Sequence, residues 1–181
     1  ITQVRGGKVK QVSVSGTAQG GKYVFEPVFI WNAPQRVADH AISRVDEGGC
    51  LCVMMNTVDE AQHVYKAIVE RQSNSEVLLF HARMMAIHRN AVEKQCVDWF
   101  GKDTRKRPPK AILVCTQVVE QSMDLDFDGM ITCIAPMDLL LQRAGRVHRH
   151  AREKRPAKMT QPLIEVLVPN AATEDAYGAS G

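Results

Sequence analysis

The sequence predicts an α/β domain built on a mostly parallel sheet that helices cover on both faces. Short apolar runs, typical of strands, alternate along the chain with amphipathic stretches that have helical spacing. Some runs, such as residues 51–55, are continuously apolar, as expected for a strand buried on both faces. In sheets of this kind ligands gather at the carboxyl ends of the strands.

The composition fits one globular domain. The 181 residues are 45% hydrophobic and 24% charged, which leaves little room for a second domain. A net charge of +3 permits an anionic partner but does not require nucleic acid. No apolar run approaches the roughly 18 residues needed to span a bilayer, so we expect no membrane partner and a cytoplasmic location. Because the chain starts at Ile1, we expect a piece of a longer protein.

The cysteine pattern does not predict zinc or disulfides. The five cysteines are an odd number and form no C-x-x-C pair. They are Cys50, Cys52, Cys96, Cys115 and Cys133. We interpret them as small hydrophobic residues of a protein in a reducing cytoplasm.

The first half of the element order starts with two strands and a glycine-rich turn within residues 1–30. A helix is expected over residues 36–47, where apolar side chains form one stripe, and Gly48 and Gly49 end it. Thr57 begins the next helix, and Glu60 completes a capping box.

The second half continues strand by helix. Further strands are predicted at 51–55, 77–80, 111–116, 130–134 and 163–168. Further helices are predicted at 84–100, which Gly101 closes, and at 138–144, which Asp138 caps and Gly145 stops. A basic loop with two prolines, residues 105–110, precedes one of the strands.

Two segments imitate nucleotide-binding motifs. Residues 16–22 fit G-x-x-x-x-G-K, but Tyr23 stands where a phosphate loop needs Ser or Thr, and a strand rather than a helix should follow. We interpret them as a hairpin turn. Residues 59–62 resemble a helicase acidic box. Because Thr57 caps the helix, the two acids fall in its first turn, where the helix dipole favours them.

The strongest functional signal is residues 142–150. Arg143, Arg146 and Arg149 recur every third position, and we expect Gly145 to leave the helix and turn the last two toward one side. At the carboxyl end of a strand such arginines can reach the oxygens of a transferring phosphate. A solvated basic helix end is the alternative, because the helix dipole favours cations there.

The second signal is residues 116–128, which follow a predicted strand. Thr116 is well placed to bind a nucleic-acid phosphate through its hydroxyl and its amide. Asp124, Asp126 and Asp128 alternate. These acids could bind a metal or a ribose, or they could form a solvated strand edge.

Together these stretches resemble the fifth and sixth motifs of superfamily-two helicases. The wording, T-Q-V-V-E-Q-S-M-D-L-D-F-D at 116–128 and A-P-M-D-L-L-L-Q-R-A-G-R-V-H-R-H at 135–150, is most similar to the helicase-nucleases of type I CRISPR interference. N-T-V at 56–58 resembles the fourth motif, and F-H-A-R at 80–83 resembles the segment after it. The resemblance is specific over about residues 50–150.

The resemblance implies a RecA-like three-layer sandwich, the helicase C-terminal domain. In this family two RecA-like domains hold ATP between them, and single-stranded nucleic acid crosses the top of both. We expect the second domain at 1–169, with lead-in strands and a helix at 1–49 and the motif-bearing core at 50–150. Residues 170–181 are expected to be a flexible tail.

The resemblance also implies site residues. Gln142, Arg146 and Arg149 would be catalytic and face the γ-phosphate, with Asp124 near the ribose. The DNA backbone would be met by Asn56, Thr57, His81, Arg83, Thr116 and Gln117. For Asn56 a simple helix-capping role is the alternative, and His81 could equally close a local hydrogen bond.

Two further features lie close to the sixth motif. His148 and His150 lack carboxylate or cysteine companions, so we interpret them as loop histidines rather than metal ligands. Arg155 carries the same charge as Arg146 and Arg149 without a predicted phosphate contact, so it is the expected control for them.

Parts of the family pattern are missing from this sequence: the first RecA-like domain and the histidine-aspartate nuclease domain. We therefore expect the chain alone to be neither an ATPase nor a nuclease, and to share ATP and Mg²⁺ with that first domain. The expected partners are those two domains, single-stranded DNA and the crRNA-guided surveillance complex of antiviral defence. An RNA helicase domain and a non-catalytic binding module stay open, because backbone contacts do not distinguish RNA from DNA.

Overall fold

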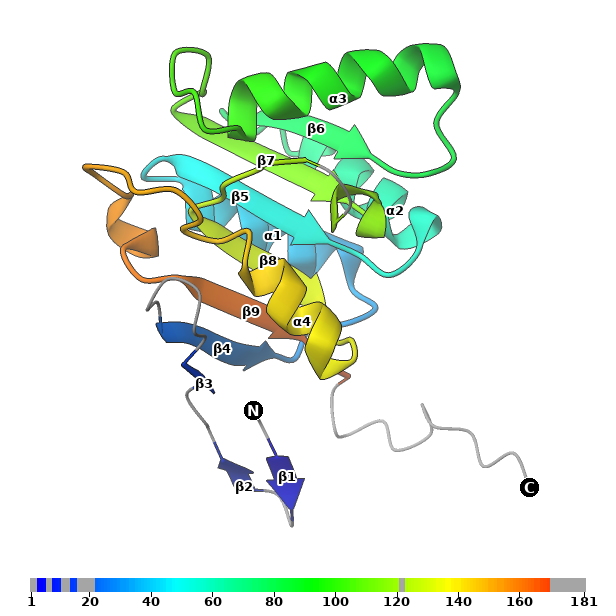
Figure 1. Cartoon of the computed structure of the whole chain (residues 1–181). Coiled ribbons are helices and arrows are strands. Elements are labelled where there is room, and N and C mark those ends of the chain that lie inside the picture. Colours follow the sequence, from blue (N-terminus) through cyan, green and yellow to red (C-terminus); the bar gives the residue numbers. More distant parts are fainter. Residues whose placement is uncertain (1–2, 6–7, 11–13, 16–21, 121–122, 170–181) are drawn as a thin grey trace.

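The computed structural model describes residues 3–5, 8–10, 14–15, 22–120 and 123–169. A seven-stranded sheet runs in the order β3-β4-β9-β8-β5-β7-β6 (Figure 1). Its strands are β3 (Val14–Ser15), β4 (Lys22–Val28), β5 (Gly49–Met54), β6 (Glu76–Phe80), β7 (Lys110–Cys115), β8 (Gly129–Cys133) and β9 (Leu163–Leu167). All pairs are parallel except β3 with β4. The predicted mostly parallel α/β fold is confirmed.

The remaining elements are helices and one small strand pair. The helices are α1 (Pro34–Val45), α2 (Val58–Glu70), α3 (Ala86–Phe100) and α4 (Met137–Ala144), with 3-10 turns η1 (Gln117–Glu120) and η2 (Ala157–Met159). Strands β1 (Gln3–Arg5) and β2 (Lys8–Lys10) form an antiparallel pair of their own. None of the helices in the described part of the chain is long and apolar enough to cross a membrane.

Helices cover both faces of the sheet. Side chains of α1 and α2 share one apolar cluster with Leu51 and Val53 of β5. Side chains of α3 and α4 share the other with Cys52 and Met54. The central strands are therefore buried on both faces, as their continuous apolar runs predict. All five cysteines are free and buried, and burial raises the pKa of the Cys50 thiol to about 12.

The capping box of α2 is confirmed. The Thr57 hydroxyl accepts a hydrogen bond from the Glu60 amide at 3.2 Å, and the Glu60 carboxylate accepts one from the Thr57 amide at 2.9 Å. Asp59 and Glu60 lie in the first turn, so rejecting the acidic-box interpretation was right.

Some sequence predictions were wrong in detail. Pro136, not Asp138, precedes α4, and Asp138 lies in its first turn. Gly145 is the C-cap that ends α4 as predicted, but its φ of −62° is an ordinary helical value, and the left-handed residue of this segment is His148, with φ +52°. The chain from residue 1 to 30 forms more strands than expected. Residues 16–21 and 170–181 lie outside the described residues, but Lys22 opens β4, so a strand and not a helix follows the glycines.

Candidate functional site

The residues expected at the DNA backbone lie at the carboxyl ends of three adjacent strands. Cys115 of β7 is in register with Met54 of β5 and with Phe80 of β6. The residues that follow these strands therefore lie side by side, and the Thr116 amide donates to the Phe80 carbonyl at 3.2 Å. The sheet thus gathers 56–57, 81–83 and 116–117 at one edge.

Side chains tie these strand ends together. Gln117 Nε2 donates to the Asn56 carbonyl at 3.2 Å, and Asn56 Nδ2 donates to the Ile134 carbonyl at 3.1 Å. Asn56 therefore bridges the ends of β5 and β8, while Thr57 is the helix cap. The simple capping role considered for Asn56 is wrong.

Several polar groups at this edge are already engaged. The Thr57 hydroxyl serves the capping box, and the Thr116 amide serves Phe80, so that amide cannot bind a phosphate as the sequence suggested. The Arg83 side chain is 73% exposed, and its ion pair with Asp59 is long, at 3.5 Å. Arg83 is the cation at this edge best able to reach a ligand.

His81 is a buried residue of the same edge. Gln62 Nε2 donates to His81 Nε2 at 3.3 Å, so the local hydrogen bond considered from the sequence is present. Burial and the Arg83 charge lower the pKa of the His81 imidazole, which favours its neutral form. Within the described residues its Nδ1 atom has no hydrogen-bond partner.

The arginine segment lies at the opposite edge of the sheet from the one that the sequence suggested. The eight residues of α4 carry the chain back toward the amino end of β8 (Figure 1). There the Phe127 amide donates to the Arg146 carbonyl at 2.9 Å, and the His148 amide donates to the Phe127 carbonyl at 3.0 Å. Phe127 lies two residues before Gly129, the first residue of β8, so the expected position at a strand's carboxyl end was wrong.

Of the three regularly spaced arginines, one belongs to the core. Arg143 is fully buried, and its Nη1 donates to the Thr132 hydroxyl at 2.7 Å and to the Cys133 carbonyl at 3.1 Å. It fastens α4 to β8. The sequence pattern gave no sign of this difference between Arg143 and its two neighbours.

The other two arginines contact residues of the fifth motif, at 116–128. Arg146 donates from Nη1 to the Met123 carbonyl. Arg149 Nε donates to Asp124 Oδ1 at 2.5 Å, and the His150 ring lies 3.1 Å from the same carboxylate. Although burial acts to raise the pKa of Asp124, the hydrogen bond from Arg149 and the nearby charges lower it overall. Gln142 is exposed on α4, one turn before Arg146.

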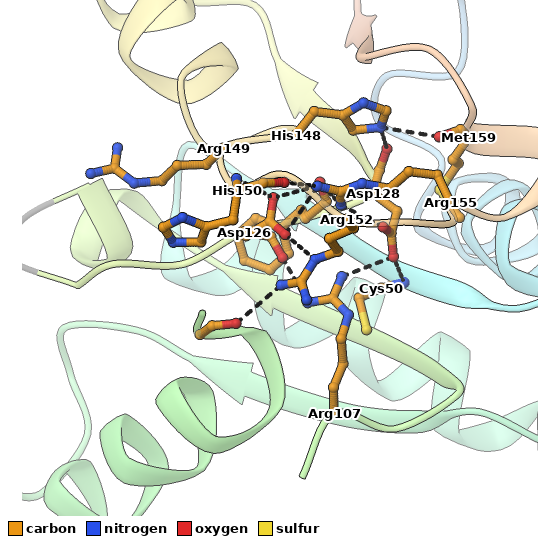
Figure 2. Close-up of polar contacts among 12 residues, drawn as sticks. Cys50, Arg107, Asp126, Asp128, His148, Arg149, His150, Arg152, Arg155 and Met159 are labelled. Atoms are coloured by element: carbon orange, nitrogen blue, oxygen red, sulfur yellow. Dashed lines mark hydrogen bonds and ion pairs between the residues drawn. The ribbon is translucent and has the colours of Figure 1, made fainter. Parts of the chain in front are cut away.

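The other two aspartates of that motif are buried. Asp126 and Asp128 are 0% and 3% exposed and form ion pairs with three nearly buried arginines (Figure 2). The partners are Arg107, Arg152 and Arg155. For these two residues the metal, ribose and solvated-edge interpretations are all wrong, and Arg155 is a structural residue unsuited to be a control. The described residues contain no group of three His, Cys, Asp or Glu side chains arranged for a metal.

His148 is one of the residues that hold this region together. Its Nε2 donates to the carbonyls of Asp128 and Met159, both at 3.0 Å (Figure 2). Burial and the Arg155 charge lower the pKa of its imidazole, which favours the neutral form. Beside it, an open hollow of 1290 Å³ is lined mainly by residues from 102–109 and 148–156.

The comparison with protein families shows to which family this chain belongs. The family model for the C-terminal part of the CRISPR-associated nuclease/helicase Cas3 matches residues 47–152. The chain belongs to this Cas3 family. The match includes every proposed site residue and ends before Arg155.

Individual Cas3 proteins are similar to this chain in sequence and in structure. The CRISPR-associated endonuclease/helicase Cas3 of Escherichia coli K12 is 42% identical over 133 residues, which cover 73% of this chain and 15% of that protein. The crystal structure of T. fusca Cas3-AMPPNP superposes with a TM-score of 0.79 at 35% identity, covering 87% of this chain and 19% of that one. A chain of a CRISPR RNA-guided surveillance complex, pre-nicking, gives 0.71 at 34% identity, covering 82% and 19%. This chain thus spans a small part of its Cas3 relatives.

Proposed function

We propose that this chain is the C-terminal motor domain of an ATP-dependent single-stranded DNA translocase that acts in CRISPR interference. The observation that carries the proposal is the contact between the two motif segments, in which Arg149 of the sixth motif binds Asp124 of the fifth. Within a Cas3-family domain, this contact brings together the residues whose resemblance implies a nucleotide site.

The chemistry of the donors fits a phosphate. Guanidinium groups form charge-assisted, often bidentate hydrogen bonds with phosphate oxygens, but they cannot bind Mg²⁺. We therefore propose that ATP and Mg²⁺ bind mainly to a first RecA-like domain and that this chain supplies Arg146, Arg149 and Gln142. When bound, ATP supplies the phosphoryl group that is transferred to water. The arginines stabilise the charge that develops on that group.

The opposite edge would hold the DNA. Arg83 and Gln117 are exposed there, and Asn56 is fixed beside Gln117 by the hydrogen bonds that join the ends of β7, β5 and β8. Closure of the two domains would tighten this edge on the backbone, and opening would release it, which gives directed steps. Contacts of this kind bind phosphates and therefore tolerate any base sequence.

The proposed partners follow from the family. A nuclease domain and a first RecA-like domain would belong to the same protein, because the Cas3 relatives are several times longer than this chain. The crRNA-guided surveillance complex is the proposed recruiting partner, because one similar chain comes from such a complex.

The test joins this chain to a first RecA-like domain and measures binding of fluorescent single-stranded DNA with and without a non-hydrolysable ATP analogue. We expect DNA affinity to change with the analogue, and Arg149→Ala to remove that change. Lys154→Ala, which alters an exposed cation of the same loop, should preserve it. A DNA affinity that is the same with and without the analogue would instead identify a non-catalytic binding module. A clear preference for RNA over DNA would identify an RNA helicase.

A further inference from the structure

A cluster of five buried charges lies next to residues 146–150, which carry Arg146 and Arg149. Asp126 and Asp128 supply the carboxylates, and Arg107, Arg152 and Arg155 supply the guanidinium groups; this set is called the charge cluster below. Each of the five side chains is 11% exposed or less. Buried charges are costly unless each has partners, and removing one leaves the others uncompensated. Such a cluster holds its backbone segments in one arrangement.

The cluster is anchored to the sheet. The Asp126 amide donates to the Phe100 carbonyl at 2.7 Å, and the Asp128 amide donates to the Cys50 carbonyl at 2.8 Å. The Asp128 carboxylate in turn accepts the Cys50 amide at 2.7 Å. Arg107, from the loop before β7, donates to the Asp126 carbonyl at 2.9 Å. These contacts fix the two aspartates relative to the ends of α3 and β5.

From this anchor the cluster reaches the residue next to Arg149. The His150 amide donates to Asp126 Oδ1 at 3.4 Å, and Arg155 Nη2 donates to the His150 carbonyl at 2.7 Å. Arg155 also donates to both Asp126 and Asp128, with distances of 2.6 to 3.1 Å. Both backbone groups of His150 are therefore held, one by each partner of the same ion pair (Figure 2).

We propose that Asp126 and Arg155 are positioning residues, which fix the backbone at His150 and thereby aim the Arg149 side chain toward the phosphate. The Arg149 guanidinium stabilises the charge that develops on a transferring phosphate only if it is held in the right place. Hydrogen-bond donors of this kind are effective when they are preorganised. The hydrogen bonds from Arg155 to Asp126 and Asp128 hold residues 126–128 and 146–155 together as one rigid unit. This inference rests on the proposed function for the role of Arg149, but the clamp itself is a property of the described chain.

The first measurement is hydrogen exchange on the 181-residue chain. Asp126→Asn and Arg155→Lys should each speed exchange of the amides in residues 146–150 by about tenfold or more, because a held loop becomes free to open. Arg155→Lys keeps the charge but replaces a planar fork by a single donor group, so it is the milder second variant to use if Asp126→Asn does not fold. Glu165→Gln is the matched control. Glu165 is 3% exposed and ion-paired with His40 and Arg44 of α1.

The outcomes separate the clamp from general destabilisation. Faster exchange at 146–150 in Arg155→Lys, with those amides unchanged in Glu165→Gln, supports the proposal. Unchanged exchange there in a folded Arg155→Lys, or an equal acceleration in Glu165→Gln, overturns it.

The second measurement is ATP turnover by a protein that joins this chain to a first RecA-like domain. If Arg155 acts through Arg149, the double variant Arg149→Ala with Arg155→Lys should lose no more turnover than Arg149→Ala alone. Glu165→Gln should combine additively with Arg149→Ala. Additive losses for Arg155 and Arg149 would overturn the positioning role. Unchanged turnover in Arg149→Ala would instead overturn the proposed function, and the hydrogen-exchange result would stand.

Discussion

Arg149 and Asp124 form a hydrogen-bonded ion pair between side chains that are 25 residues apart in the sequence. Their side chains are 44% and 54% exposed. Exposed pairs of this kind contribute about 0–1 kcal/mol, because water competes for both charges. Arg149 can therefore exchange the carboxylate for a phosphate oxygen at little cost. The pair keeps the guanidinium at the edge where the nucleotide is proposed to bind.

We expect Arg146→Ala and Arg149→Ala each to reduce DNA-stimulated ATP turnover in the longer protein while leaving the fold intact. An arginine that meets the transition-state charge is worth roughly 10³–10⁵ in rate. Lys should rescue only part of the loss, because it lacks the planar pair of donors. Phosphate release and thermal melts would be measured together.

The control for this pair is Lys154→Ala rather than Arg155→Ala. Lys154 is an exposed cation of the same segment, whereas Arg155 is nearly buried between two carboxylates. If Lys154→Ala reduces turnover as much as Arg149→Ala does, the segment acts as a general basic surface and the assignment of Arg149 is wrong.

The isolated chain should fold but should not hydrolyse ATP. The glycine-rich residues 16–21 are followed by strand β4, in which Tyr23 occupies the position where a phosphate loop has the Ser or Thr that binds magnesium. Phosphate release would be measured with and without single-stranded DNA. Turnover that Lys22→Ala abolishes would show that this segment is a phosphate loop after all.

The isolated chain should bind single-stranded DNA weakly, with little base preference and a shallow salt dependence, because few phosphates are neutralised. Arg83→Ala should weaken binding and lower the salt slope by about one. Arg105→Ala is the matched control, because Arg105 is also an exposed arginine paired with an aspartate but precedes β7 at the other edge. A steep slope, or equal effects of the two variants, would indicate a different DNA surface.

Local signals in the sequence predicted the framework well. The capping box of Thr57 and Glu60 involves residues three apart, and the apolar runs report directly on burial, so the structure confirms both predictions. The parallel-sheet rule also predicted the row of polar residues that follows β5, β6 and β7, because the carboxyl ends of parallel strands share an edge.

The errors concern partners that are distant in the sequence. The pattern of alternating acids predicts exposed or ligand-binding roles for Asp126 and Asp128, because nothing nearby in the sequence indicates that arginines 21 to 29 residues away neutralise their carboxylates. Arg143, Arg146 and Arg149 look alike in the pattern, yet one is buried and the others are not, because only the packing of α4 on β8 distinguishes them. The sequence could predict which segments matter but not the edge to which α4 returns the chain.

Gly49→Ala should destabilise the fold. Gly49 has a φ of +111°, and an added Cβ would lie 2.6 Å from a ring carbon of Pro156. Backbone strain of this kind costs about 1–3 kcal/mol. Gly145→Ala is the comparison: its φ is −62° and the nearest atom to an added Cβ is 3.4 Å away, so thermal melts should show little change. A loss at Gly145 as large as that at Gly49 would contradict this account.

Asp128 should make the fold sensitive to acid. Burial acts to raise the pKa of its carboxyl, but the Arg107 charge and the hydrogen bonds from Arg155 and the Cys50 amide outweigh burial, and the pKa falls below the ordinary value of 3.8. Because the folded pKa is the lower one, the unfolded chain takes up the proton first as the pH falls. The stability contributed by this carboxylate is therefore present above about pH 5 and is lost as the pH falls through 3.8 toward the folded pKa.

Asp128→Asn should melt at a lower temperature than the unmodified chain at pH 7, and this gap in melting temperature should narrow as the pH approaches 3. Melting curves from pH 3 to pH 7 would test this, and a gap that stays constant would show that the Asp128 charge is not what holds the cluster together.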